Sequence, residues 1–140
     1  SVDHAEAEDL VQEAFVRFWR TRHGVRDPVA YLYQTVRSAA INTARSRQAR
    51  EAREATFVDS RHETPRFVCA SEYEERRQRI EAALAQLAPE QAEVVTLKIW
   101  SDLTFAQIAE VTSTPPGTVA SRYRYALDNL RIVLHESELT

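Results

Sequence analysis

Apolar residues recur along most of the chain at the spacing of an amphipathic α-helix. Between residues 5 and 22 they fall at i, i+1, i+4, i+5, i+8 and i+9, so they form one broad stripe on a helix. The stripe consists of Leu10, Val11, Ala14, Phe15, Phe18 and Trp19. We expect these residues to be core, the aromatic ones included. The other face carries acids first and arginines last, in the order that the helix dipole favours.

A second helix is predicted from the pair Asp27-Pro28 to about residue 54. Aspartate is a favoured N-cap, and proline fits the first helical position, where the backbone N–H has no intrahelical acceptor. Residues 37–53 hold five arginines against one glutamate, a local charge of +4, whereas acids gather at 6–13 and 72–93. The basic end has almost no apolar side chain to bury, so it is either solvated or bound to an anion.

Residues 55–71 lose the helical period and include Pro65, which is typical of a linker. Beyond them, four more helices are predicted. Three span residues 73–87, 89–100 and 115–134, and a short one begins at residue 105. The chain is therefore predicted to be all-α, with two small helical domains, 1–54 and 72–140, joined by the linker. Two glycines and five prolines among many Ala, Leu, Glu, Gln and Arg residues leave little material for hairpins.

Composition excludes several classes of protein. Cys69 is the sole cysteine, and the four histidines lack the spacing of metal ligands, so we expect no metal and no cofactor. No nucleophile, base and orienting group recur at a recognisable spacing, so we expect no enzyme.

No apolar stretch reaches about 20 residues, and the first residues lack a signal pattern. A cytoplasmic protein without membrane insertion is expected. The start at Ser1, without methionine, suggests a fragment.

The segment 104–130, TFAQIAEVTSTPPGTVASRYRYALDNL, has the pattern of a helix-turn-helix. Thr104 stands three residues before Gln107, which is the spacing of a capping box, so a short helix begins at residue 105. The turn is Thr112-Ser113-Thr114, after which Thr114 caps a helix that begins at Pro115 or one residue later. Apolar residues of the short helix then pack against the long one.

The long helix would turn one face inward and leave the other free. The inward residues are Val119, Tyr123, Ala126 and Leu127, and those outside or at the edge are Gly117, Thr118, Ala120, Ser121, Arg122, Arg124, Tyr125 and Asp128. Arginine can bridge guanine O6 and N7 or a phosphate, and hydroxyls can bond to base or backbone. This face fits a major groove, although an ordinary solvated helix with scattered arginines has the same composition.

Three stretches together resemble a known family, the bacterial RNA polymerase sigma factors of the extracytoplasmic-function type. LAQLAPEQAEVVTLKIW (84–100), LTFAQIAEV (103–111) and GTVASRYRYALDNLR (117–131) resemble their region 4. HAEAEDLVQEAFVRFWR (4–20) resembles region 2.2, and DPVAYLYQTVRSAAINTARSRQAR (27–50) resembles regions 2.3 and 2.4. The resemblance implies a promoter-specificity subunit without catalytic activity of its own. Region 2 would read the minus-ten element and region 4 the minus-thirty-five element.

The resemblance also assigns residues to the contact with each partner. The residues facing the β′ clamp helices of core RNA polymerase are Glu6, Asp9, Gln12 and Glu13. Those facing promoter DNA at the end of region 2 are Asn42, Arg45 and Arg47. Those of the recognition helix are Thr118, Ser121, Arg122, Arg124 and Tyr125. Region 4 would also bind the β flap, and an anti-sigma factor is a further partner to consider.

The sequence departs from the family pattern at several positions. Ser113 replaces the usual glycine of the turn, so we expect a turn built without an easy positive φ. Ala120 and Tyr125 stand where the family often has basic residues, which leaves the promoter preference open. A helix that normally precedes region 2.2 is not in the sequence, so we expect some aromatic side chains to lack part of their cover, namely Phe15, Phe18, Trp19 and Tyr31.

Two other functions remain open on the residues alone. The first is a stand-alone helix-turn-helix regulator, which would bind a palindrome tightly by itself. The second is a helical protein-interaction module that binds no DNA. A sigma factor differs from both because specific initiation requires core polymerase.

Overall fold

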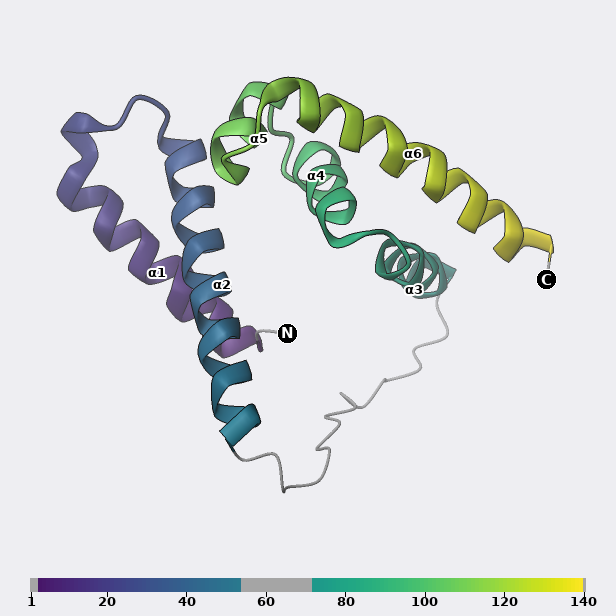
Figure 1. The fold of residues 1–140 in the computed structure, drawn as a ribbon, viewed down its shortest axis with the longest axis horizontal. Helices are drawn as coiled ribbons and strands as arrows, with labels where there is room; N and C mark the ends of the chain where they lie inside the picture. Colours follow the sequence, from purple (N-terminus) through teal and green to yellow (C-terminus); the bar gives the residue numbers. More distant parts are fainter. Residues whose placement is uncertain (1–2, 54–71, 140) are drawn as a thin grey trace. The chain divides into compact units, whose positions relative to one another are not determined.

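The computed structural model of the 140-residue chain describes residues 3–53 and 72–139, and within them it contains helices and no strand. The elements are α1 (His4–Thr21), the 3₁₀ turn η1 (Arg22–Gly24), α2 (Pro28–Arg53), α3 (Glu72–Ala85), α4 (Pro89–Ile99), α5 (Phe105–Thr112) and α6 (Pro116–Leu139) (Figure 1). The all-α prediction is confirmed. The predicted linker, 55–71, lies outside the described residues, and so does Cys69.

The helices belong to two compact units, one built on α1 and α2 and the other on α3, α4, α6 and most of α5. In the first unit both helix starts are capped as their sequences require. Asp3 and Glu6 form a capping box at α1, with the Glu6 N–H donating to Asp3 Oδ1 at 2.8 Å. Asp27 caps α2, accepting from the Ala30 N–H at 3.1 Å, as predicted.

The two helices of the first unit run antiparallel. Ala14 of α1 and Ala30 of α2 are almost completely buried. Near the turn, the rings of Phe18 and Tyr31 lie 6.1 Å apart between centroids, and the Thr21 hydroxyl donates to the Tyr31 hydroxyl at 3.3 Å. Figure 1 shows the two helices side by side.

The prediction that every aromatic residue of α1 lies in the core is wrong. Phe15 is 54% exposed and Trp19 64%, and Val11 on the same side of α1 is 41% exposed. The apolar stripe is broader than the strip that one crossing helix can cover. α2 therefore covers the edge with Ala14 and Phe18 and leaves the other edge open. Arg22 stacks over the open side, with its guanidinium carbon 4.0 Å from the centre of the Trp19 ring.

The second unit has a core between α4, α6 and the end of α3. Leu87, Val95 and Ala126 are buried at its centre, and partly buried residues surround them: Leu84, Ala92, Tyr123, Leu127 and Leu130. α4 begins at Pro89 directly after Ala88, as predicted, because proline fits the first helical turn. The inward face predicted for the last helix is thus confirmed, and the helix extends five residues past the predicted end.

The short helix α5 begins with the predicted capping box. The Thr104 N–H donates to Gln107 Oε1 at 2.9 Å, and the Gln107 N–H donates to the Thr104 hydroxyl at 3.1 Å. Ile108 of α5 and Val119 of α6 are fully buried. The rings of Phe105 and Tyr123 meet edge to face at 5.4 Å, which joins the two helices of the helix-turn-helix.

The turn between α5 and α6 differs from its prediction. Ser113 adopts φ 52°, so the left-handed conformation is used without a glycine. It lets the Thr114 N–H reach the Ala109 carbonyl at 3.0 Å, which closes the end of α5. α6 then begins at Pro116, and its first helical bond runs from Val119 to the Pro115 carbonyl at 3.1 Å. The start slips by one residue because Pro116 disfavours helical geometry at Pro115.

Replacing Ser113 with glycine should stabilise the protein. A left-handed residue with a Cβ costs roughly 1–2 kcal/mol, of which the greater entropy of unfolded glycine cancels a part. We expect Ser113→Gly to raise the free energy of unfolding by about 0.5–1 kcal/mol in urea titrations followed by circular dichroism. Ala120→Gly, on the exposed side of α6, should lower it by about 1 kcal/mol. A loss of stability in Ser113→Gly would contradict this account of the turn.

Candidate nucleic-acid interface

The first part of α6 carries the residues predicted to read DNA. Thr118, Arg124 and Tyr125 are exposed, and Ser121 and Arg122 are half-buried at the edge of the contact with the core. At about 100° per residue, Thr118, Ser121, Arg122 and Tyr125 lie within an arc of about 100°, and Arg124 lies about 60° to one side of Ser121. The structure thus brings all five residues to one side of one helix.

The opposite side of α6 explains why this face is free. Val119 and Ala126 are fully buried and Tyr123 packs against the core, so the inner side is committed to α4 and α5. The side-chain amide of Asn129 donates to Gln91 Oε1 of α4 at 3.0 Å, which fixes α6 along its axis as well. The predicted recognition face is therefore backed by packed core, while its own side chains are exposed or half-buried.

The chemistry of this face is compatible with DNA. It offers two guanidinium groups, two aliphatic hydroxyls and a phenol, all of which can donate hydrogen bonds to phosphates or base edges. The guanidinium carbon of Arg124 lies 5.7 Å from the centre of the Tyr125 ring, so the arginine leans on the aromatic face. Tyr125 itself is 55% exposed, which is high for a large aromatic residue.

The second predicted DNA contact is the basic end of α2. Asn42 and Arg45 are exposed, as a binding face requires, and Arg47 is half-buried. A shallow cavity of about 310 Å³ lies on this side of α2, and it is lined by Glu6, Asn42, Thr43, Ser46, Arg47 and Arg50. Two predicted DNA contacts, Asn42 and Arg47, therefore lie together, and α1 contributes one acid to the same cavity.

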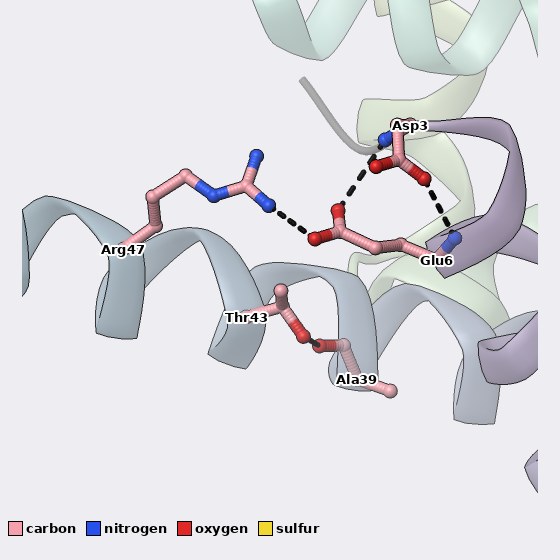
Figure 2. A network of polar contacts seen from close by, with 5 residues as sticks. All are labelled: Asp3, Glu6, Ala39, Thr43 and Arg47. Atoms are coloured by element: carbon pink, nitrogen blue, oxygen red, sulfur yellow. Dashed lines mark hydrogen bonds and ion pairs between the residues drawn. The ribbon is translucent and has the colours of Figure 1, made fainter.

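Arg47 is not an isolated cation, because Glu6 of α1 lies beside it. The Arg47 guanidinium donates to Glu6 Oε1 at 2.5 Å, across 41 residues of sequence (Figure 2). The other carboxylate oxygen of Glu6 accepts from the Asp3 N–H at 3.3 Å in the capping box. This hydrogen bond and charge raise the pKa of Arg47, with smaller contributions from Glu51 and Asp3, so the guanidinium stays charged.

Of the four residues predicted to face the polymerase, three are exposed on α1 and one is turned toward α2. Asp9, Gln12 and Glu13 are exposed on α1, and Glu13 pairs with Arg17 one turn on at 3.0 Å. Glu6 is half-buried and turned toward α2 instead. Sequence reasoning missed its pairing with Arg47, although a signal existed. In an antiparallel pair of helices, residues equidistant from the turn lie side by side, and the midpoint of this pair falls at the turn between α1 and α2.

The described part of the chain shows no group of three or more His, Cys, Asp and Glu side chains that could hold a metal ion. None of the helices in these residues is both long and apolar enough to cross a membrane.

Comparison with known proteins identifies both halves of the chain. Residues 2–50 match the family model described as Sigma-70 region 2, and residues 77–130 match Sigma-70, region 4. The ECF RNA polymerase sigma factor SigL of Mycobacterium tuberculosis is 34% identical over 144 residues, which cover 99% of this chain and 80% of the relative. The RNA polymerase sigma-E factor of Streptomyces antibioticus is 29% identical, covering 98% of this chain and 75% of the relative.

A solved structure is similar along nearly the whole chain. It is that of the sigma factor RpoE from Bartonella quintana, in complex with the anti-sigma factor NepR, with a TM-score of 0.69 and 25% identity. The match covers 96% of this chain and 84% of that one. The helix-turn-helix with its free basic face, the basic end of α2 and these matches lead to one conclusion. The chain belongs to the extracytoplasmic-function family of RNA polymerase sigma factors, non-enzymatic subunits that direct the polymerase to promoters.

Proposed function

We propose that the exposed face of α6 reads the minus-thirty-five element of a promoter in the major groove. The observation that carries this proposal is the one-sided distribution of α6, with a fully buried inner face and five hydrogen-bonding residues on the outer one. Arg122 and Arg124 are the residues suited to guanine or phosphate, Thr118 to the backbone at the helix start, and Ser121 and Tyr125 to either. Because Ala120 and Tyr125 stand where the family often has basic residues, this face carries few cations.

The basic end of α2 is the proposed contact with the minus-ten element. Asn42 and Arg45 support it because they are exposed on a helix whose end carries several more arginines and little apolar surface. Arg47 lies at the same end, although its guanidinium is paired with Glu6. The two proposed DNA contacts belong to separate units, as the two predicted domains, 1–54 and 72–140, require.

The exposed acids of α1 are the proposed contact with the β′ clamp helices of core RNA polymerase, and region 4 is proposed to bind the β flap. Asp9, Gln12 and Glu13 carry the clamp contact, because they remain accessible on α1. Such a protein works in the cytoplasm, where the polymerase is. The complex of the similar Bartonella protein with NepR supports an anti-sigma factor as a further partner of this chain.

Reconstituted run-off transcription tests the function as a whole. The chain and core RNA polymerase together should start transcription at discrete sites in a library of genomic fragments, whereas either component alone should not. The start sites define the promoter, which the next two experiments need. Specific and tight binding of the chain alone to a palindrome, with no effect of core polymerase, would favour a stand-alone regulator instead.

The two arginines of the recognition face should each contribute to promoter affinity. We expect Arg122→Ala or Arg124→Ala to weaken holoenzyme binding to the promoter by about 1–3 kcal/mol if the side chain reads a base, and to reduce the salt slope by about 1 if it contacts phosphate. Arg131→Ala, which removes the same charge about two turns further along α6, is the matched control. Unchanged affinity and salt slope in both variants would remove the proposed role of this face.

The acids of α1 should act on the polymerase and not on DNA. The double variant Asp9→Asn/Glu13→Gln should weaken binding to core polymerase in a fluorescence titration by roughly tenfold, since each exposed charge pair contributes up to about 1 kcal/mol. Glu8→Gln removes a charge about 100° around α1 from Asp9, where Glu8 pairs with His4, and should change little. An equal effect of Glu8→Gln would show that net charge, and not this face, determines the binding.

A further inference from the structure

We propose that Glu6 restrains Arg47 from binding DNA, so that an acid at the start of α1 limits the affinity of the basic end of α2 for phosphate. The inference rests on the proposed role of that end in facing promoter DNA. It also changes the role of Glu6, which the family resemblance places with the polymerase-binding acids. In this structure its carboxylate is directed to Arg47 instead.

The geometry holds the Glu6 carboxylate at this place from two sides. One oxygen accepts the Asp3 N–H in the capping box, and the other accepts the Arg47 guanidinium at 2.5 Å (Figure 2). Because the cap fixes Glu6 at the start of α1, the carboxylate does not have to be ordered anew to hold Arg47. The restraint is thus built into the start of the helix.

Exposure shows that DNA could compete for the same group. The Arg47 side chain is 41% exposed and the Glu6 side chain 37%, so a phosphate oxygen can reach the pair from solvent. A phosphate at Arg47 would then lie close to the Glu6 carboxylate, and two negative charges would share one guanidinium. Glu6 therefore lowers the affinity of Arg47 for a DNA phosphate in two ways. It occupies a hydrogen-bond donor of the guanidinium, and its charge repels the phosphate.

The rest of the cavity favours an anion. Apart from Glu6, its lining consists of two arginines and three neutral polar residues, namely Arg47, Arg50, Asn42, Thr43 and Ser46. The hydroxyl of Thr43 donates to the Ala39 carbonyl at 2.9 Å, so it is used within α2, whereas Asn42, Ser46 and Arg50 are exposed. The charges of Glu51 and Asp3 also raise the pKa of Arg47, but more weakly than Glu6 does. Neutralising Glu6 would leave the cavity basic.

A purely structural role does not require a charge at this position. Glutamine at the third position of a helix closes a capping box as glutamate does. Ion pairs between exposed side chains add little to stability. Glu6→Gln therefore keeps the cap and removes the charge, which makes it the variant that separates restraint from structure.

The test compares DNA binding by the full chain and by its Glu6→Gln variant. The probes are a fluorescein-labelled single strand of about 20 nucleotides with mixed sequence, and its duplex, in anisotropy titrations over a range of NaCl concentrations. If Arg47 gains a phosphate, the salt slope should steepen by about 0.7 for the single strand and about 0.9 for the duplex. One such contact corresponds to roughly five- to tenfold tighter binding near 0.1 M salt.

Three further variants decide whether the effect passes through Arg47. In the Arg47→Gln background, Glu6→Gln should change neither affinity nor slope relative to Arg47→Gln alone. Glu8→Gln makes the same change of charge at an exposed position of α1 and should not steepen the slope. Helix content by circular dichroism verifies folding, and an unfolded glutamine variant is replaced by Glu6→Ala with Asp3 retained.

Several outcomes would overturn the proposal. They are unchanged or weaker binding in Glu6→Gln, an equal gain in Glu8→Gln, and a gain that persists without Arg47. Weaker binding would instead indicate that Glu6 holds Arg47 in place for DNA. The result is independent of run-off transcription, because the titrations use neither polymerase nor promoter. A gain in binding without promoter-directed initiation would therefore reject the proposed function and leave the restraint of Arg47 standing.

Discussion

Close packing around small side chains supports both units of this protein. Ala14 of α1, Ala30 of α2, Ala83 of α3 and Ala126 of α6 are almost completely buried. A buried alanine lets neighbouring elements pack closely around it. A larger residue at any of these four positions would need space that the packing does not leave, so the neighbouring elements would have to shift.

Tight packing on one side of a helix is what makes the other side usable. In α6, Val119 and Ala126 are fully buried, and Arg124 and Tyr125 stand exposed on the opposite side. The hydrogen bond between Asn129 and Gln91 fixes the helix further along, away from the recognition residues. A helix that binds DNA needs such support, because a mobile helix would have to be ordered on binding, and the entropy lost in that step lowers the affinity.

Local signals made most of the fold predictable. A cap or a proline predicts where three of the helices begin, and the structure confirms each start. The signals are Asp27 before Pro28, Pro89 after Ala88, and Thr104 before Gln107. The helical period of the apolar residues was enough to predict the inner face of α6. The left-handed conformation of Ser113 could not be predicted, because serine disfavours a positive φ. In the structure the hydrogen bond from the Thr114 N–H to the Ala109 carbonyl compensates the strain.

Features that depend on which helix meets which were harder to predict. The stripe of α1 indicates burial for Phe15 and Trp19 as strongly as for Phe18, and only the width of the crossing with α2 separates them. The same holds for the candidate site. The residues of α6 could be assigned because they lie on one helix, whereas Glu6 and Arg47 come together only through the antiparallel pairing, so two residues assigned to different partners turned out to be partners of each other.

The ion pair of Glu6 and Arg47 has one more consequence, which follows from its place in the first unit. It joins α1 and α2 at the end opposite η1, so a pair of helices closed by a turn at one end is also fastened at the other. Helix ends normally fray independently, each at its own rate. Here a contact links the first turn of α1 to α2 about two turns before α2 ends, so opening of either helix end breaks a contact of the other.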